Sequence, residues 1–137
     1  MNQGIDIQHH KLRGEWAELR FMARCAEHGL RIAKPWGDTS RYDFAIEHNG
    51  HFVRVQVKCT ISKHGDSYKC FASSSNGVFY AANQVDFIAA YIIPADVWYI
   101  IPVAVTCTQQ RIVLSPHLRN SKYAKYKEAW HLLFHGE

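Results

Sequence analysis

Three polar residues in the middle of the chain have side chains suited to metal-assisted phosphate chemistry: Asp43, Gln56 and Lys58. Carboxylate and amide oxygens are the kind of ligand that Mg²⁺ prefers, and this cation often completes its shell with water and substrate phosphate. An ammonium group beside them can hold the attacking water or offset the charge that develops on the phosphate. This chemistry requires a fold that brings the three groups together.

The residues on either side of Asn49-Gly50 predict a β-hairpin. The runs Tyr42–His48 and His51–Cys59 are strand-like, and only two residues separate them. A two-residue Asn-Gly loop is typical of a type I′ turn, because both of its residues need a positive φ. The turn therefore fixes which residues of the two strands oppose each other.

In this register Asp43 opposes Gln56, and Lys58 projects two residues further along the same face. Directly opposed Cβ atoms lie about 4.5–5.5 Å apart, so the three side chains converge on one patch. The other face is wholly apolar and is expected to form the core side: Phe44, Ile46, Val53, Val55 and Val57. A polar strand face is also common on a solvent-facing sheet. From geometry alone, a solvated surface is therefore a better interpretation of these three residues than an active site.

Short motifs occur in a fixed order along most of the chain: Gly14–Glu18, Gly29, Pro35, Gly37-Asp38, Tyr42-Asp43, Gln56–Lys58, Val85–Phe87, Trp98–Pro102 and Lys122-Tyr123…Trp130. This order resembles the PD-(D/E)xK nuclease superfamily, most of all the small endonucleases associated with group I introns and more distantly the archaeal Holliday-junction resolvases. Two positions depart from the superfamily pattern. Tyr42 stands where a proline precedes the aspartate, and Gln56 replaces the acidic residue, as the intron-type branch is known to do.

The resemblance implies a role for each residue of the patch. Asp43 would be the principal metal ligand, Gln56 would position metal or water, and the Val57 carbonyl would add a ligand. Lys58 would orient the nucleophile or stabilise the transition state. The implied cofactor is Mg²⁺, for which Mn²⁺ can substitute. Because the Gln56 amide is neutral, we expect weak metal binding in the free protein, with DNA phosphate completing the site.

The resemblance also implies an acid on the first helix that completes the metal shell. Glu18 matches the G-x-x-A-E pattern of the family and is the preferred candidate. Glu15 remains a competitor, because the two residues border the same apolar arc and differ by about 60° around the helix.

Candidate DNA contacts lie after the hairpin turn and in an uncharged loop. A basic bias runs from His51 to Cys70, and the loop offers hydrogen-bonding side chains for phosphate or base edges. A flexible connection is the slightly preferred interpretation of that loop. The predicted DNA-binding residues are Arg54, Lys63, His64, Ser74 and Asn76.

The remaining pattern predicts an α/β or α+β fold around one sheet. The expected elements are a helix over Lys11–His28, strands over Leu30–Ala33, Ser67–Ala72, Asp86–Ile93, Val97–Val105 and Gln110–Leu114, and a helix after Asn120-Ser121. On that last helix one face would carry Tyr123, Tyr126, Trp130, Leu133 and Phe134. The resemblance implies a single restriction-endonuclease-like domain over residues 1–137, with a central mixed β-sheet flanked by helices.

Composition sets bounds on the class of protein. The chain has 137 residues, 47% hydrophobic and 20% charged, which is typical of a globular domain. A net charge of +4 permits a nucleic-acid partner without demanding one. Four scattered cysteines without a CxxC pair, and a start without an apolar signal segment, favour the cytoplasm. The apolar stretch Phe87–Val105 contains Asp96 and two prolines, so it predicts two buried strands and no membrane contact.

Together these observations favour a divalent-metal-dependent DNA endonuclease of the intron type, acting on double-stranded DNA. One rival is a Holliday-junction resolvase-like nuclease that cuts branched DNA. Another is a DNA-binding protein that keeps the nuclease fold without the chemistry. Gln56 supports this rival, whereas the intact Asp43, Lys58 and Glu18 oppose it. One site per chain cuts one strand, so we expect a homodimer or a dimer of dimers.

Overall fold

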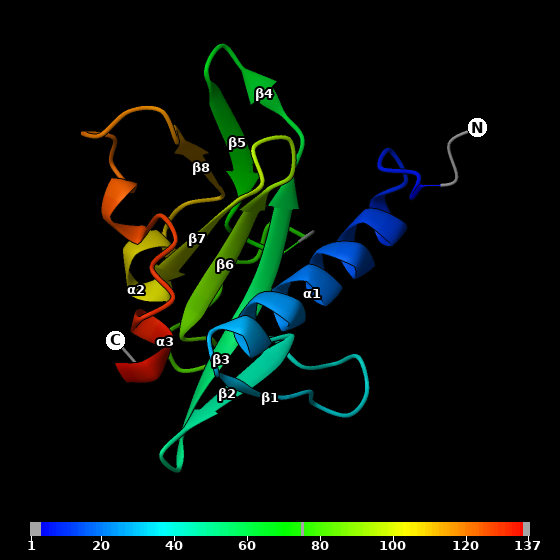
Figure 1. The fold of residues 1–137 in the computed structure, drawn as a ribbon, viewed down its shortest axis with the longest axis vertical. Helices are drawn as coiled ribbons and strands as arrows, with labels where there is room; N and C mark the ends of the chain where they lie inside the picture. The colour runs from blue at the N-terminus through cyan, green and yellow to red at the C-terminus, as the bar shows by residue number, and fades with distance from the viewer. Residues whose placement is uncertain (1–3, 75, 136–137) are drawn as a thin grey trace.

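The computed structural model describes residues 4–74 and 76–135, which form the expected α+β fold with a central mixed sheet (Figure 1). The elements in chain order are α1 (His10–Glu27), β1 (Arg31–Ala33), β2 (Phe44–His48), β3 (His51–Thr60), β4 (Lys63–His64), β5 (Ser67–Phe71), β6 (Phe87–Ile92), β7 (Val97–Pro102), α2 (Val103–Thr106), β8 (Arg111–Leu114), the 3₁₀ helix η1 (Ala124–Tyr126) and α3 (Leu132–His135).

The strands form two separate sheets. The five-stranded sheet has the order β1-β2-β3-β6-β7, and a three-stranded sheet has the order β4-β5-β8. All neighbouring pairs are antiparallel except β3 and β6, which run parallel. The long strand β3 lies at the centre of the larger sheet, and the chain after it turns directly into the smaller one (Figure 1).

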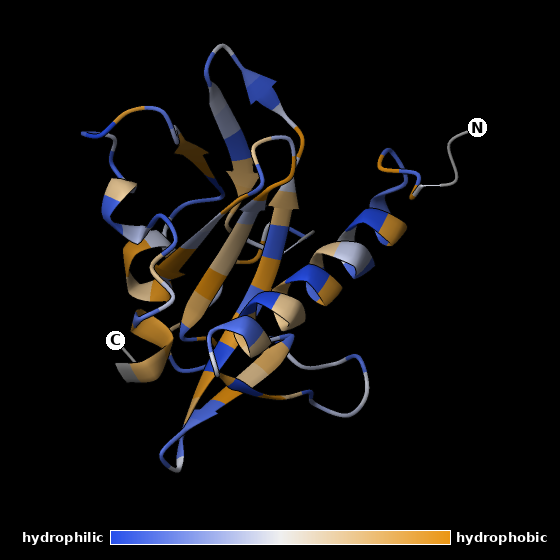
Figure 2. Cartoon of the chain, viewed as in Figure 1, coloured by the Kyte–Doolittle hydropathy of each residue, from blue (hydrophilic) through white to orange (hydrophobic). Residues whose placement is uncertain are grey.

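The hairpin register predicted from Asn49-Gly50 is confirmed. Both turn residues have a positive φ, 52° for Asn49 and 80° for Gly50, as a type I′ turn requires. The ladder pairs Phe44 with Val55 at one end and His48 with His51 at the other. All five residues predicted for the core face are buried: Phe44, Ile46, Val53, Val55 and Val57. Figure 2 shows the resulting alternation of hydrophilic and hydrophobic residues along β3.

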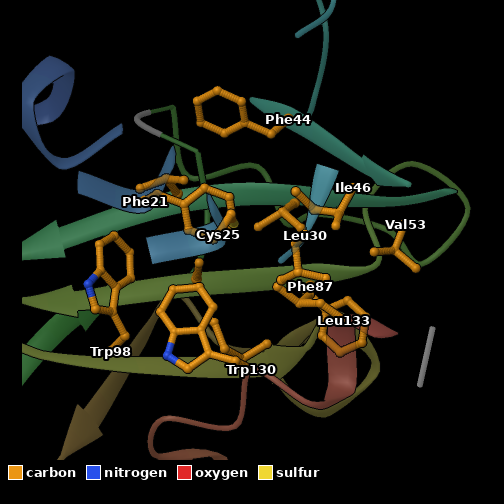
Figure 3. Close-up of a cluster of buried hydrophobic side chains, with 14 of the residues drawn as sticks. Phe21, Cys25, Leu30, Phe44, Ile46, Val53, Phe87, Trp98, Trp130 and Leu133 are labelled. Atoms are coloured by element: carbon orange, nitrogen blue, oxygen red, sulfur yellow. The ribbon is translucent and has the colours of Figure 1, made fainter. Parts of the chain in front are cut away.

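Helix α1 packs on this apolar face. Its buried residues Ala17, Phe21 and Cys25 recur at helical spacing and join the hairpin residues in one core cluster. Figure 3 shows Phe21 and Cys25 among the hairpin residues Phe44, Ile46 and Val53. The Phe21 ring stacks on Phe44, with ring centroids 5.5 Å apart. Since β2 and β3 supply the other side of this cluster, the helix fixes the hairpin against the rest of the sheet.

The predicted continuous C-terminal helix is wrong. The segment forms only η1 and the short α3, because Glu128 between them adopts φ 51° and leaves the helical conformation. Glu128 donates its N–H to the Trp98 carbonyl at 2.7 Å and accepts the Trp98 N–H on its carboxylate at 2.8 Å. The segment thus forms hydrogen bonds with the edge strand β7. Its apolar side chains are still buried, as predicted: Tyr123, Tyr126, Trp130 and Leu133.

The apolar stretch Phe87–Val105 forms the two predicted strands up to Pro102. Its last three residues are an exception, because Val103 begins the short helix α2 where strand had been predicted. Every residue of β6 is buried, which accounts for its continuous apolar sequence (Figure 2). In the described part of the chain, no helix is long and apolar enough to cross a membrane.

The contacts of Glu128 lead to a stability prediction. Its carboxylate also accepts from Trp130 Nε1 at 2.8 Å, so Glu128→Ala leaves two donors in a buried region without partners. We expect a loss of about 2–4 kcal/mol in the free energy of unfolding, measured by urea denaturation. Glu27→Ala, which removes an exposed partner of Arg24, should cost about 1 kcal/mol or less. Equal losses for the two variants would contradict the prediction.

Candidate active site

Asp43, Gln56 and Lys58 line one pocket of ≈ 400 Å³, here called the Asp43 pocket. The loop before β2 forms one side of it, and β3 supplies the glutamine and the lysine from the face opposite its buried valines. The remaining lining residues are Asp38, Thr39, Ser40, Arg41, Ser74 and Tyr80. The structure therefore brings together the three residues that the hairpin geometry selected.

Asp43 lies where the β2–β3 ladder ends. The last paired residues are Phe44 and Val55. The Asp43 N–H donates a hydrogen bond to the Val55 carbonyl oxygen at 2.9 Å. Its carboxylate Oδ2 accepts the Val57 N–H at 2.8 Å. The predicted pairing of Asp43 with Gln56 is therefore not part of the ladder. Instead, one backbone and one side-chain hydrogen bond join Asp43 to β3 and fix its side chain beside the strand that carries Gln56.

The environment of Asp43 makes its carboxyl a weak acid. Burial raises the pKa of Asp43 to about 6, and the nearby charge of Glu18 contributes to the rise. The Val57 N–H, Lys34 and Lys58 act in the opposite direction without cancelling it. A carboxylate that is costly to ionise in this way gains from a cation placed against it, as expected of a metal ligand.

Glu18 approaches Asp43 without lining the Asp43 pocket. Its carboxylate accepts from Lys34 Nζ at 3.3 Å, and it is close enough to affect the pKa of Asp43. Glu15 is exposed on the same helix, whereas Glu18 is partly buried. This placement favours Glu18 over Glu15 as the helix acid, and its role as a ligand stays a prediction.

The donor set fits a hard divalent cation whose shell is only partly supplied by protein. Among the described residues, no group of three His, Cys, Asp or Glu side chains is placed to hold a metal. The available oxygens are the carboxylates of Asp43 and Glu18 and the Gln56 amide, which suit Mg²⁺ when water and substrate phosphate fill the other positions. Val57 presents its N–H to Asp43, and ligation by its carbonyl stays a prediction.

Sequence reasoning missed Arg41 and Tyr80, which complete the pocket wall. The buried Tyr80 ring has Arg41 Cζ 4.9 Å and Lys58 Nζ 5.1 Å from its centroid. These cation–π contacts place two positively charged side chains against one ring in the wall of the Asp43 pocket. Arg41 stands two residues before Asp43 and was a detectable candidate, whereas Tyr80 lies in an uncharged stretch far along the chain with no local signal.

The predicted DNA-binding residues separate into two groups. Arg54 is held by the protein, with two bonds to the Asp86 carboxylate at 3.0 Å and others to the carbonyls of Ala82 and Asn83. The other four lie on the surface or at a pocket. Ser74 lines the Asp43 pocket, His64 lines a neighbouring one, and Lys63 and Asn76 are exposed. DNA contact by all five stays a prediction, and the bonds of Arg54 favour a structural use.

Comparison with known proteins identifies the family of this chain. The family model for PD-(D/E)XK endonucleases matches residues 8–133. Among solved structures, the chain is similar to a bacterial homing endonuclease, I-Ssp6803I, with 27% identity and a TM-score of 0.79. The match covers 93% of this chain and 92% of that one. No curated protein matches the chain.

The raised pKa of Asp43 predicts a pH-dependent cost in stability. The unfolded carboxyl ionises near its ordinary pKa of 3.8, whereas the folded one keeps its proton until about pH 6. Stability should therefore fall as pH rises from about 4 to 6, and the full cost should be present above that range. Without metal, Asp43→Asn should raise the free energy of unfolding by about 2–3 kcal/mol near pH 8 and change it little near pH 4.

Urea denaturation in EDTA at the two pH values measures this difference. Asp66→Asn, in the exposed turn between β4 and β5, removes the same charge and should show no such pH-dependent gain. An Asp43→Asn variant that is less stable than the parent near pH 8 would contradict the electrostatic account of the site.

Proposed function

This chain belongs to the PD-(D/E)XK endonuclease family, and on that premise we propose that it is a divalent-metal-dependent DNA endonuclease. The observation that carries the proposal is the shared pocket of Asp43, Gln56 and Lys58, in which the aspartate is anchored by the Val57 N–H. A solvated strand face accounts for three polar residues, but it does not account for a carboxyl held half-buried with a pKa of about 6.

Each residue has a chemical task in this proposal. Asp43 and the Gln56 amide oxygen hold Mg²⁺ or Mn²⁺, with Glu18 and the Val57 carbonyl as further ligands. The bound cation supplies Lewis-acid polarisation of the phosphate and a more acidic water. Lys58, steadied over the Tyr80 ring, directs its ammonium group toward the attacking water or a phosphate oxygen.

The proposed substrate is long double-stranded DNA cut at a specific site. The similarity to a bacterial homing endonuclease over nearly the full length of both chains supports this choice over branched DNA. Residues 1–137 are proposed to act as a single domain, which the family match over 8–133 supports.

Cleavage assays with purified protein test the proposal. With Mg²⁺ or Mn²⁺ and a library of long natural DNA, we expect nicks or breaks that EDTA abolishes. Lys58→Ala should reduce cleavage by at least a hundredfold while DNA binding is retained, because the ammonium group acts on the reacting phosphate. Lys125→Ala removes the same charge from an exposed position outside the Asp43 pocket and should cut normally.

Three results would change the conclusion. Preferential cutting of four-way junctions over linear duplex would favour a resolvase. Binding without cutting of any substrate with either metal would favour a DNA-binding protein on the nuclease fold. Full activity of Lys58→Ala would remove the lysine from the proposed chemistry.

We also propose that the protein acts as a homodimer or a dimer of dimers. One Asp43 pocket cuts one strand, so cutting both strands of a duplex calls for two pockets related by a two-fold axis. Light scattering at micromolar concentration should give a mass of at least twice the 15.8 kDa of one chain. A monomer that stays monomeric on DNA would instead describe a nicking enzyme.

A further inference from the structure

A second pocket, of ≈ 580 Å³, lies beside the Asp43 pocket and is lined by basic side chains. Its lining residues come from the first turns of α1, from the C-terminal half of β3 and from all three strands of the smaller sheet, β4, β5 and β8. Figure 1 shows where these elements lie in the fold. We call it the basic pocket, after the six residues His10, Arg13, Lys58, His64, Lys69 and Arg111 that line it.

The basic pocket has no acidic side chain in its own lining. Within the described chain, neither its lysines nor its arginines form a salt bridge. The protein as a whole carries a net charge of only +4, so this pocket concentrates much of the excess. Like charges gathered without partners repel one another, and an anion between them removes that cost.

The smaller sheet directs two of these cations outward. Phe71 on β5 pairs with Arg111 on β8, and Lys69 lies two residues before Phe71 on the same face. All three are exposed, while the alternate residues Tyr68 and Cys70 are buried. Arg111 Cζ lies 5.1 Å from the Phe71 ring centroid, so its guanidinium is supported over an apolar floor.

Helix α1 holds a third cation on the opposite side. Arg13 Nη1 donates to the Ile7 carbonyl at 3.0 Å, and its Nη2 lies 3.1 Å from His10 Nδ1. These bonds use two of its five donor hydrogens and fix the direction of the guanidinium. The pocket is therefore built from positioned side chains on separate elements.

Lys58 lines both pockets, so the basic pocket adjoins the site where cleavage is proposed. Successive phosphates on a DNA strand carry one charge per about 3.4 Å of helix axis, so a strand with one phosphate at Lys58 must place its neighbours close by. We infer that the basic pocket binds the backbone phosphates adjacent to the scissile one, on the strand being cut. This inference rests on the proposed function and adds a phosphate-binding subsite to it.

The salt dependence of binding tests the subsite apart from cleavage. The probe is a short duplex of mixed sequence, titrated in EDTA so that no cutting occurs. Each phosphate contact contributes about −0.9 to the slope of log K against log salt concentration, so Lys69→Ala/Arg111→Ala should reduce the slope by about 1.8. The matched control Lys122→Ala/Lys125→Ala removes two exposed charges that line neither pocket and should keep the parent slope.

The outcomes separate the two proposals. A reduced slope for the pocket variant alone supports the subsite, including in the case that the parent protein never cuts DNA. An unchanged slope, or an equal reduction in the control, overturns the subsite while a cleavage assay of the parent still decides the proposed function. Unchanged urea midpoints show that both double variants remain folded.

Discussion

The register between β2 and β3 is the constraint on which the rest of the molecule depends. Side chains of a strand alternate between two faces, so β3 sends Val53, Val55 and Val57 into the core beneath α1 while Gln56 and Lys58 face the Asp43 pocket. A slip of one residue would bury the polar pair and expose the valines. The energy of core packing therefore also holds the site residues on their proper face.

The Asp43 carboxyl shows where this arrangement trades stability for chemistry. The ladder ends at Phe44, and the residue before it, Asp43, accepts the Val57 N–H of β3 on its half-buried carboxylate. Burial and the neighbouring Glu18 raise the pKa of Asp43 to about 6, so ionising this carboxyl costs stability, and a cation placed against it would reduce that cost. Because the Gln56 amide is neutral, this chain avoids a third negative charge beside Asp43 and Glu18.

How much the sequence predicts depends on the range of the interactions that decide each element. The hairpin was predictable because the Asn49-Gly50 turn and the alternating pattern act locally. The C-terminal segment was mispredicted because Glu128 leaves helical geometry to bond the edge of β7, thirty residues away in the chain. Tyr80 was missed for the same reason, since only the folded chain places its ring beside Lys58.

The basic residues show why counting charge does not locate a nucleic-acid surface. Arg54 stands between two site residues in sequence, yet Asp86 and two carbonyls take up its guanidinium, where it ties β3 to the segment before β6. Arg13, Lys69 and Arg111 come from three separate elements and meet in one pocket without a carboxylate. An anionic polymer responds to such a local field far more than to the net charge, because screening limits each charge to its near surroundings. The proposed phosphate contacts are therefore assigned to cations that have no carboxylate partner within the described chain.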